Sequence, residues 1–308
     1  MNVRESDRRA FEVWGERARE RQNVNRSIVA WTDSPLVLRG YVHPAISGRP
    51  DENWLGWAIR RYFPEPVGLA VSIGSGDGGL ERHGLAAGLA RRFEGFDASA
   101  GAVELARRLA AEHGIADRAT YAVADLNEHV FEPGRYDAAL ASMAVHHIQN
   151  LEHFFVQVQR AVKPGALFVM SEFVGPTQFQ WTDRQMRLAD ELLQDIPREY
   201  RRSLQSGHVK KRATRQTVAQ MNAIDPTEAV RSAEIIPIMW KYFEVIEQVD
   251  FGGTLLNLVL EEIAGNFTDN PHDLAILDRL FAAERRLLRS SAIPSDFSVL
   301  VGRVRAEM

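Results

Sequence analysis

The sequence contains no cysteine among its 308 residues. Disulfides, thiolate metal sites and a cysteine nucleophile are therefore excluded, and the absence fits a reducing compartment. Residues 1–22 carry charged side chains throughout and have no apolar core of the kind that a signal peptide needs. We therefore expect a cytoplasmic protein.

Long hydrophobic runs and an excess of positive charge are missing as well. No run approaches the roughly 18 consecutive apolar residues of a membrane-spanning helix. The 37 basic residues stand against 41 acidic ones, and the net charge of −4 leaves no basic footprint for nucleic acid. With 45% hydrophobic and 25% charged residues, the composition is that of a soluble globular enzyme. We expect neither nucleic acid nor a membrane as partner.

A dense glycine cluster, Gly74-Ser75-Gly76-Asp77-Gly78-Gly79, follows the short apolar run Leu69–Ile73. The next residues, ERHGLAAGLARR, are compatible with a helix. A strand, a glycine turn and a helix place bare backbone N–H groups and a helix N-terminus against a ligand. A second apolar and aromatic run ends in Asp97, whose carboxylate can accept both hydroxyls of a ribose.

The glycines fit two spacings at once. Gly74, Gly76 and Gly79 match the G-x-G-x-x-G of dinucleotide-binding proteins, whereas Gly74, Gly76 and Gly78 match the G-x-G-x-G of S-adenosylmethionine (SAM) methyltransferases. Asp77 favours the second, because a carboxylate would repel a pyrophosphate, while SAM carries an ammonium and a sulfonium. An ordinary strand-to-helix turn with spare glycines is the alternative to a ligand site.

Strand-like and helix-like segments alternate between Pro66 and Gly175, which indicates a parallel sheet with helices on both faces. The predicted strands are Leu69–Ile73, about Arg92–Phe96, Ala119–Val123, Tyr136–Ala141, Ala166–Ser171, Tyr242–Val249 and Phe297–Val304. Outside the alternating region, helices are predicted at Ser6–Ile28, Phe179–Ser203, His208–Met221, Thr254–Gly265 and His272–Ser290, with further helix starts at Asp51 and at Asp225–Ser232.

Several of these segments together resemble the Rossmann-like, seven-strand type of SAM-dependent methyltransferases, in the small-molecule branch. The resemblance covers about Pro66–Gly175, and the C-terminal strands more loosely. It rests on VSIGSGDGG, FEGFDAS, ADL, DAALASMAVHHIQNLEHFF and VKPGALFVMSEF. It implies an α/β fold: a Rossmann-like, doubly wound, mostly parallel seven-stranded sheet with an antiparallel edge, plus a helical cap.

The resemblance also implies SAM as the cofactor and S-adenosylhomocysteine as its product. The glycine loop would hold the methionine part, Asp97 the ribose hydroxyls, and Asp125 with Leu126 the adenine. Many members carry an acid at the position of Ser72, so Asp77 or Glu81 would take over the methionyl amine. The predicted cofactor-binding residues are Ser72, Gly74, Ser75, Gly76, Asp77, Gly78, Asp97, Ala98, Asp125, Leu126 and Ser142.

Methyl transfer depends mainly on placing the acceptor, and a base is needed only if the acceptor must lose a proton. His146, His147 and Glu172 follow strands four and five, so we predict that they orient or deprotonate a hydroxyl. The alternative is packing or hydrogen bonding alone for the histidines, and a hydrogen bond to a cap element for Glu172. Substrate contacts are predicted at Tyr41, His43 and Trp54. No metal is expected, because adjacent histidines cannot easily face one ion and no Asp/His cluster accompanies them.

These predictions divide the chain into an N-terminal helical cap or lid (1–62), a SAM-binding core (63–175), an inserted helical cap (176–235), and C-terminal core strands with inserted helices (236–308). The favoured function is methyl transfer from SAM to a small molecule, with a hydroxyl oxygen of glycan or natural-product type preferred. An NAD(P)-dependent oxidoreductase and a non-catalytic SAM-binding protein are the alternatives. A homodimer stays open.

Overall fold

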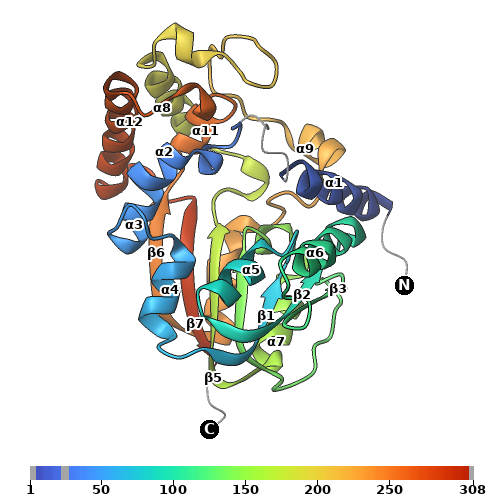
Figure 1. Cartoon of the computed structure of the whole chain (residues 1–308). Helices are drawn as coiled ribbons and strands as arrows, with labels where there is room; N and C mark the ends of the chain where they lie inside the picture. The colour runs from blue at the N-terminus through green and yellow to red at the C-terminus, as the bar shows by residue number, and fades with distance from the viewer. Residues whose placement is uncertain (1–4, 22–27, 305–308) are drawn as a thin grey trace.

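The computed structural model describes residues 5–21 and 28–304, and it has a single seven-stranded sheet in that part of the chain (Figure 1). The strand order is β3-β2-β1-β4-β5-β7-β6. The first five strands are parallel, whereas β7 runs antiparallel to both of its neighbours. The predicted mostly parallel sheet with an antiparallel edge is thus confirmed. The strands are β1 (Val67–Ile73), β2 (Ala90–Asp97), β3 (Ala119–Val123), β4 (Tyr136–Ser142), β5 (Val162–Phe173), β6 (Phe243–Gly252) and β7 (Phe297–Val304).

Helices cover both faces of this sheet because its central strands are apolar on both sides. Along β4, Ala138 and Leu140 face one hydrophobic cluster, while Ala139 and Ala141 face the other. This alternation follows from the period of two residues in a strand. The first face packs against α4 (Trp54–Tyr62), α5 (Gly79–Ala86) and α6 (Ala100–Glu112), and the second against α7 (Leu151–Ala161) and α10 (Ile235–Tyr242).

The remaining helices lie in the upper half of Figure 1, most of them beyond the end of the sheet where the parallel strands finish, and α3 beside β6. They are α1 (Glu5–Arg21), α2 (Pro35–Val37), α3 (His43–Ser47), α8 (Asp183–Gln194), α9 (Val218–Ile224), α11 (Leu256–Leu260) and α12 (Pro271–Arg289). We call these helices and the turns that join them, among them η1 (Trp31–Asp33) and η2 (Leu38–Val42), the cap. The division of the chain into four segments stays a prediction.

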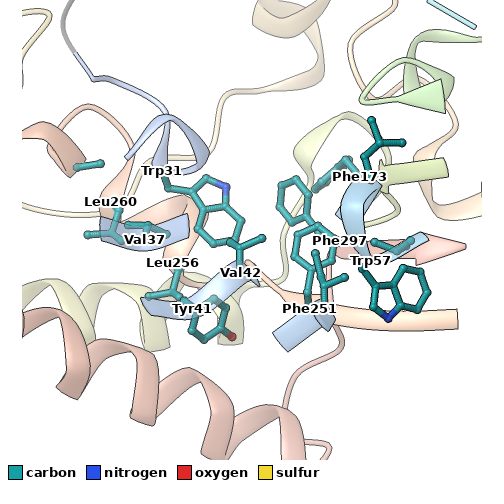
Figure 2. Packing of buried hydrophobic residues seen from close by; sticks show 14 of the residues in the cluster. Trp31, Val37, Tyr41, Val42, Trp57, Phe173, Phe251, Leu256, Leu260 and Phe297 are labelled. Atoms are coloured by element: carbon teal, nitrogen blue, oxygen red, sulfur yellow. The ribbon is translucent and has the colours of Figure 1, made fainter. Parts of the chain in front are cut away.

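The cap and the sheet share one hydrophobic cluster (Figure 2). Trp31 of the cap packs edge-on against Phe297 of β7, with ring centroids 5.3 Å apart. A buried carboxylate on α12 ties the cap segments together, because Glu284 accepts hydrogen bonds from the Tyr41 hydroxyl at 2.6 Å and from three backbone N–H groups of 253–256. The cap is therefore fixed on the core by packing and by buried hydrogen bonds.

Several predicted helices are shorter than expected. The segment His208–Met221 is helical only from Val218, where Thr217 and Gln220 form a capping box. The helix predicted after the glycine loop ends at Ala86, and residues 90–92 already belong to β2. A left-handed glycine, Gly88 with φ of +76°, forms the turn between them.

Three helix starts or ends were also wrong. Asn53 rather than Asp51 caps α4, since its side chain accepts from the Gly56 N–H. Asp225 begins a turn and not a helix, because its carboxylate binds the Thr227 N–H and a distant tryptophan. The predicted helix Ser6–Ile28 is observed to Arg21, Ile28 is not helical, and residues 22–27 lie outside the described part.

Within the described ranges, no helix has the length and apolarity that crossing a membrane requires.

Candidate functional site

A cavity of about 660 Å³ lies between the cap and the carboxyl ends of the parallel strands. Its volume falls in the range of about 300–1,000 Å³ that is typical of small-molecule sites. The loops after β1, β2, β3 and β4 form one wall, and α1, the segment around Trp31 and residues 227–228 form others. Ligands bind at this end of open α/β sheets.

The glycine loop lines this cavity through Gly74, Ser75, Gly76 and Asp77. Gly74 has φ of +62°, and a Cβ atom there would strike the Ala144 side chain in the neighbouring loop. Both the backbone conformation and the close approach of the two loops therefore require glycine at this position. The result is a turn whose backbone faces the cavity at the start of α5.

Asp97 at the end of β2 connects the glycine loop to α6. Its Oδ2 accepts from the Gly76 N–H and its Oδ1 from the Ser99 N–H, both at 2.8 Å. Burial raises the pKa of this carboxyl, and the two N–H groups oppose that effect. Asp97 lines the cavity, and each oxygen retains a lone pair that can accept a ligand hydroxyl.

Asp125, Leu126, Ala98 and Ser142, which are predicted to contact the cofactor, also line the cavity. Asp125 Oδ1 accepts from the backbone and side-chain nitrogens of Asn127. The loops after β1, β2, β3 and β4 thus bring the predicted cofactor residues to one surface.

Ser72 and Gly78, which were expected to contact the cofactor, do not line the cavity. Ser72 is 2% exposed, and Glu81 is fully buried behind the glycine loop. Burial raises the pKa of the Glu81 carboxyl to about 7, against opposing effects of its own backbone and of Ser72. Of the two acids expected to replace an acid at position 72, only Asp77 faces the cavity; it also lies 3.6 Å from Arg82.

Glu172 lies behind the cavity wall, not on it. Its Oε2 accepts from the Ala144 and Val145 N–H groups at 2.9 and 2.7 Å, and its Oε1 is 2.5 Å from His146 Nδ1. Burial would raise the pKa of this carboxyl, but His146 and the backbone donors lower it. Its expected direct contact with the acceptor is therefore wrong, because the side chain is used to hold the loop after β4.

His146 is held between two carboxylates. On its other side, Nε2 lies 3.4 Å from Glu228 Oε1. Burial alone would lower the pKa of His146, but Glu172 and Glu228 raise it to about 10. The ring therefore carries a proton on both nitrogens at neutral pH and donates hydrogen bonds rather than accepting a proton.

His147 has a different environment, although its ring centroid is only 4.1 Å from that of His146. Its Nδ1 lies 3.3 Å from the Thr227 hydroxyl, and its ring packs on Trp14 with centroids 4.6 Å apart. Burial and the neighbouring charge of His146 lower the pKa of His147 to about 4. This ring is therefore neutral at neutral pH.

Two of the three predicted substrate contacts are wrong. Tyr41 is 1% exposed and its hydroxyl binds Glu284, so it belongs to the core of the cap. His43 lies outside the cavity, where its Nδ1 bonds to the Pro50 carbonyl at 2.9 Å. Trp54 does line the cavity. Sequence reasoning missed other aromatic and polar lining residues: Phe11, Trp14, Phe173, Phe179, Thr227, Glu228, Asn257 and Phe297.

The sequence indicated no acidic residue beside the two histidines, but Glu228, from a distant part of the chain, lies next to them. One nitrogen each of His146 and His147 and one oxygen of Glu228 lie within 4.8 Å of one another. Thr227, next to Glu228, is separated from His147 by 80 residues in sequence. No local spacing could have indicated this arrangement.

Residues 70–165 match the family model described as "Methyltransferase domain". The chain resembles the Rossmann-like SAM-dependent methyltransferases. Among the methyltransferases it is similar to, sterol 4-C-methyltransferase strm-1 of Caenorhabditis elegans is 26% identical over 139 residues, which are 44% of this chain and 41% of that protein. The probable chloroplastic tocopherol O-methyltransferase of Oryza sativa subsp. japonica is 29% identical over 100 residues, 32% of this chain and 27% of that protein.

The matches thus span less than half the length of these curated relatives. Among methyltransferases of known structure, the geranyl diphosphate C-methyltransferase of Streptomyces coelicolor A3(2) superposes with a TM-score of 0.56 at 13% identity. That superposition covers 98% of this chain and 99% of the other. The similarity in fold therefore includes the cap segments as well as the sheet.

Proposed function

We propose that this chain is a SAM-dependent methyltransferase that transfers the methyl group to a hydroxyl oxygen of a small molecule. One observation carries the proposal: the glycine loop, Asp97 and Asp125 line the same cavity as His147 and Glu228. A cofactor end and a polar acceptor end thus share one cavity, as transfer between two bound molecules requires.

SAM fits the cofactor end by the chemistry of its residues. The glycine loop offers backbone N–H groups, Asp97 has acceptor capacity for ribose hydroxyls, and Asp77 offers a negative charge to the methionyl ammonium. The match of residues 70–165 to the methyltransferase domain supports this choice over a nicotinamide dinucleotide.

The relatives include both a C- and an O-methyltransferase, so they do not distinguish carbon from oxygen as the methylated atom. The preference for oxygen therefore rests on the residues at the acceptor end of the cavity. In the proposed step the acceptor oxygen bonds to the methyl carbon while the carbon–sulfur bond breaks, and the sulfonium becomes the thioether of S-adenosylhomocysteine. The hydroxyl proton leaves to the His147–Glu228 pair, in which the imidazole is neutral at neutral pH. Aromatic lining residues would cover the acceptor and exclude water.

Calorimetric titration of the chain with SAM, S-adenosylhomocysteine, NAD⁺ and NADP⁺ tests the cofactor. We expect binding of the first two only. Binding of a nicotinamide dinucleotide instead would support an oxidoreductase and overturn the proposal.

A screen for methylated small molecules by mass spectrometry, with purified chain and SAM, tests the activity. With the acceptor found, His147→Ala should lower the rate at saturating SAM by about 10²–10⁴-fold while SAM affinity is retained. His113→Ala is the matched control, because that histidine is exposed at the end of α6. A loss below tenfold would show that placement alone suffices, and SAM binding without any product would identify a non-catalytic protein.

A further inference from the structure

The cluster beside the cavity combines groups from two distant segments. His146 and His147 lie in the turn η3 (Val145–His147) after β4, and Glu228 lies in the turn after α9. One ring nitrogen of each histidine and one Glu228 oxygen lie within 4.8 Å of one another. We propose that His146, His147 and Glu228 bind a divalent transition-metal ion of the zinc class.

The hydrogen bond of His146 to Glu172 fixes which nitrogen is available. An ionised carboxylate only accepts, so His146 Nδ1 donates its hydrogen to Glu172 Oε1 at 2.5 Å. When the second proton of His146 leaves, the lone pair lies on Nε2, which is 3.4 Å from Glu228 Oε1. Histidine ligands of metals typically donate their other N–H to a carboxylate in this way.

A chain of two hydrogen bonds places the hydrogen of His147 on Nδ1, as Glu172 does for His146. The Thr227 hydroxyl donates its hydrogen to Asp225 Oδ1 at 2.6 Å, so its oxygen accepts from His147 Nδ1 at 3.3 Å. The lone pair of His147 is therefore on Nε2 as well. In both rings Nδ1 is fixed by a group from another part of the chain, so that an ion displacing the proton of His146 Nε2 would be offered the Nε2 atoms.

The spacing and the donor types agree with this assignment. A tetrahedral ion with bonds of about 2.1 Å has ligand atoms about 3.4 Å apart, which is the distance between His146 Nε2 and Glu228 Oε1. Two imidazoles and one carboxylate suit zinc and neighbouring transition metals better than Mg²⁺ or Ca²⁺. All three residues line the cavity, so a fourth position would open into it.

The two segments are also held in register by main-chain bonds. The Val230 N–H donates to the His146 carbonyl at 3.1 Å, and Glu172 binds the Ala144 and Val145 N–H groups. Ligands held this way lose little conformational freedom when an ion binds, and the ion takes the place of a proton between His146 and Glu228.

The role of the ion rests on the proposed function. An acceptor hydroxyl bound at the open position would be held near the cofactor end of the same cavity. A cation lowers the pKa of a bound hydroxyl, so that its proton can leave to water at neutral pH. With an ion bound, the two histidines would act as ligands; the His147–Glu228 pair would take the hydroxyl proton only in the chain without an ion.

The test uses the full chain after treatment with a chelator, without SAM and without acceptor. Co²⁺ is titrated in and followed by its visible absorption, and Zn²⁺ is then added as a competitor. We expect one Co²⁺ per chain, displaced by Zn²⁺. Glu228→Ala and His147→Ala should each weaken Co²⁺ binding by more than about 100-fold, and Glu172→Gln by about 10–100-fold, as for an outer-shell partner.

His113→Ala should bind Co²⁺ as the wild type does, and circular dichroism checks that each variant is folded. Binding that is equal in folded Glu228→Ala and in the wild type, or no binding of one equivalent, would overturn the site and leave His146 as an imidazolium between two carboxylates. Failure of methyl transfer would not affect this result, since the titration contains neither SAM nor acceptor. Absence of Co²⁺ binding would likewise leave the proposed methyl transfer standing.

Discussion

Replacement of Asp97 is the sharpest test of the proposed cofactor site. Each carboxylate oxygen already accepts one backbone N–H, from Gly76 and from Ser99, so a ligand ribose would use the remaining lone pairs. Asp97→Ala removes both the ribose contacts and the internal bonds. Asp97→Asn keeps the shape but must turn its NH₂ group toward one of the two N–H donors.

The expected magnitude follows from these bonds. A hydrogen bond to a charged group contributes about 1.5–3 kcal/mol. Loss of the ribose contacts in Asp97→Ala should therefore weaken SAM binding by roughly 10–150-fold. Asp97→Asn should also lose stability, by about 1–3 kcal/mol, because one donor faces another and the Ser99 side is almost fully buried.

Isothermal titration with SAM and urea unfolding measure the two effects separately. Asp117→Ala, an exposed acid after α6, serves as the control and should change neither quantity. If folded Asp97→Ala binds SAM as tightly as the wild type, Asp97 does not contact the ribose and the assignment fails. If Asp97→Asn is as stable as the wild type, the Asp97 carboxylate does not accept hydrogen bonds from both Gly76 and Ser99 in the folded protein.

Two further predictions concern groups next to the site. The folded-state pKa of Glu81, about 7, lies above its ordinary value of 4.5. The contribution of the protonated carboxyl to stability is therefore present below pH 4.5 and lost as the pH rises to about 7 and above. The free energy of unfolding of the wild type, measured relative to that of Glu81→Gln, should fall by about 3 kcal/mol between pH 4 and 8. A difference in urea midpoint between the two proteins that is the same at both pH values would contradict this. Trp14 Nε1 donates to Asp225 at 2.8 Å, so Trp14→Phe should speed hydrogen exchange in α1 and in 225–228, whereas Trp240→Phe, at an exposed site, should not. Unchanged exchange in both peptides would show that Trp14 does not tie α1 to the site.

The sheet could be predicted from the sequence because its strands carry their own signals. The apolar runs are bounded by glycine or proline turns, and Ala119–Val123 and Phe297–Val304 were predicted with the observed ends. The predicted cofactor residues follow from the same logic, since they stand at the ends of consecutive strands. At Gly74 the structure adds what the sequence could not show, a positive φ and a close approach to Ala144.

The cap could not be predicted as well, because tertiary contacts decide its local structure. The polar segment His208–Gln216 has a helix-compatible composition but is not helical. Tyr41 seemed available for a substrate by its aromatic surroundings, yet its hydroxyl is bound to a buried glutamate 243 residues away. Partners at such separations leave no periodic pattern in the sequence.

The acceptor end shows the same limit in chemical terms. Adjacent histidines seemed unable to face one ion. In the short 3-10 turn η3, however, the two rings lie side by side, with centroids 4.1 Å apart and planes tilted by 40°. Which nitrogen each ring offers is then decided by Glu172 on one side and Thr227 on the other, and these residues come from separate segments. A residue type and its place after a strand can therefore indicate that chemistry occurs there. Whether a histidine acts as a donor, a base or a ligand depends on hydrogen-bond partners that only the folded chain brings together.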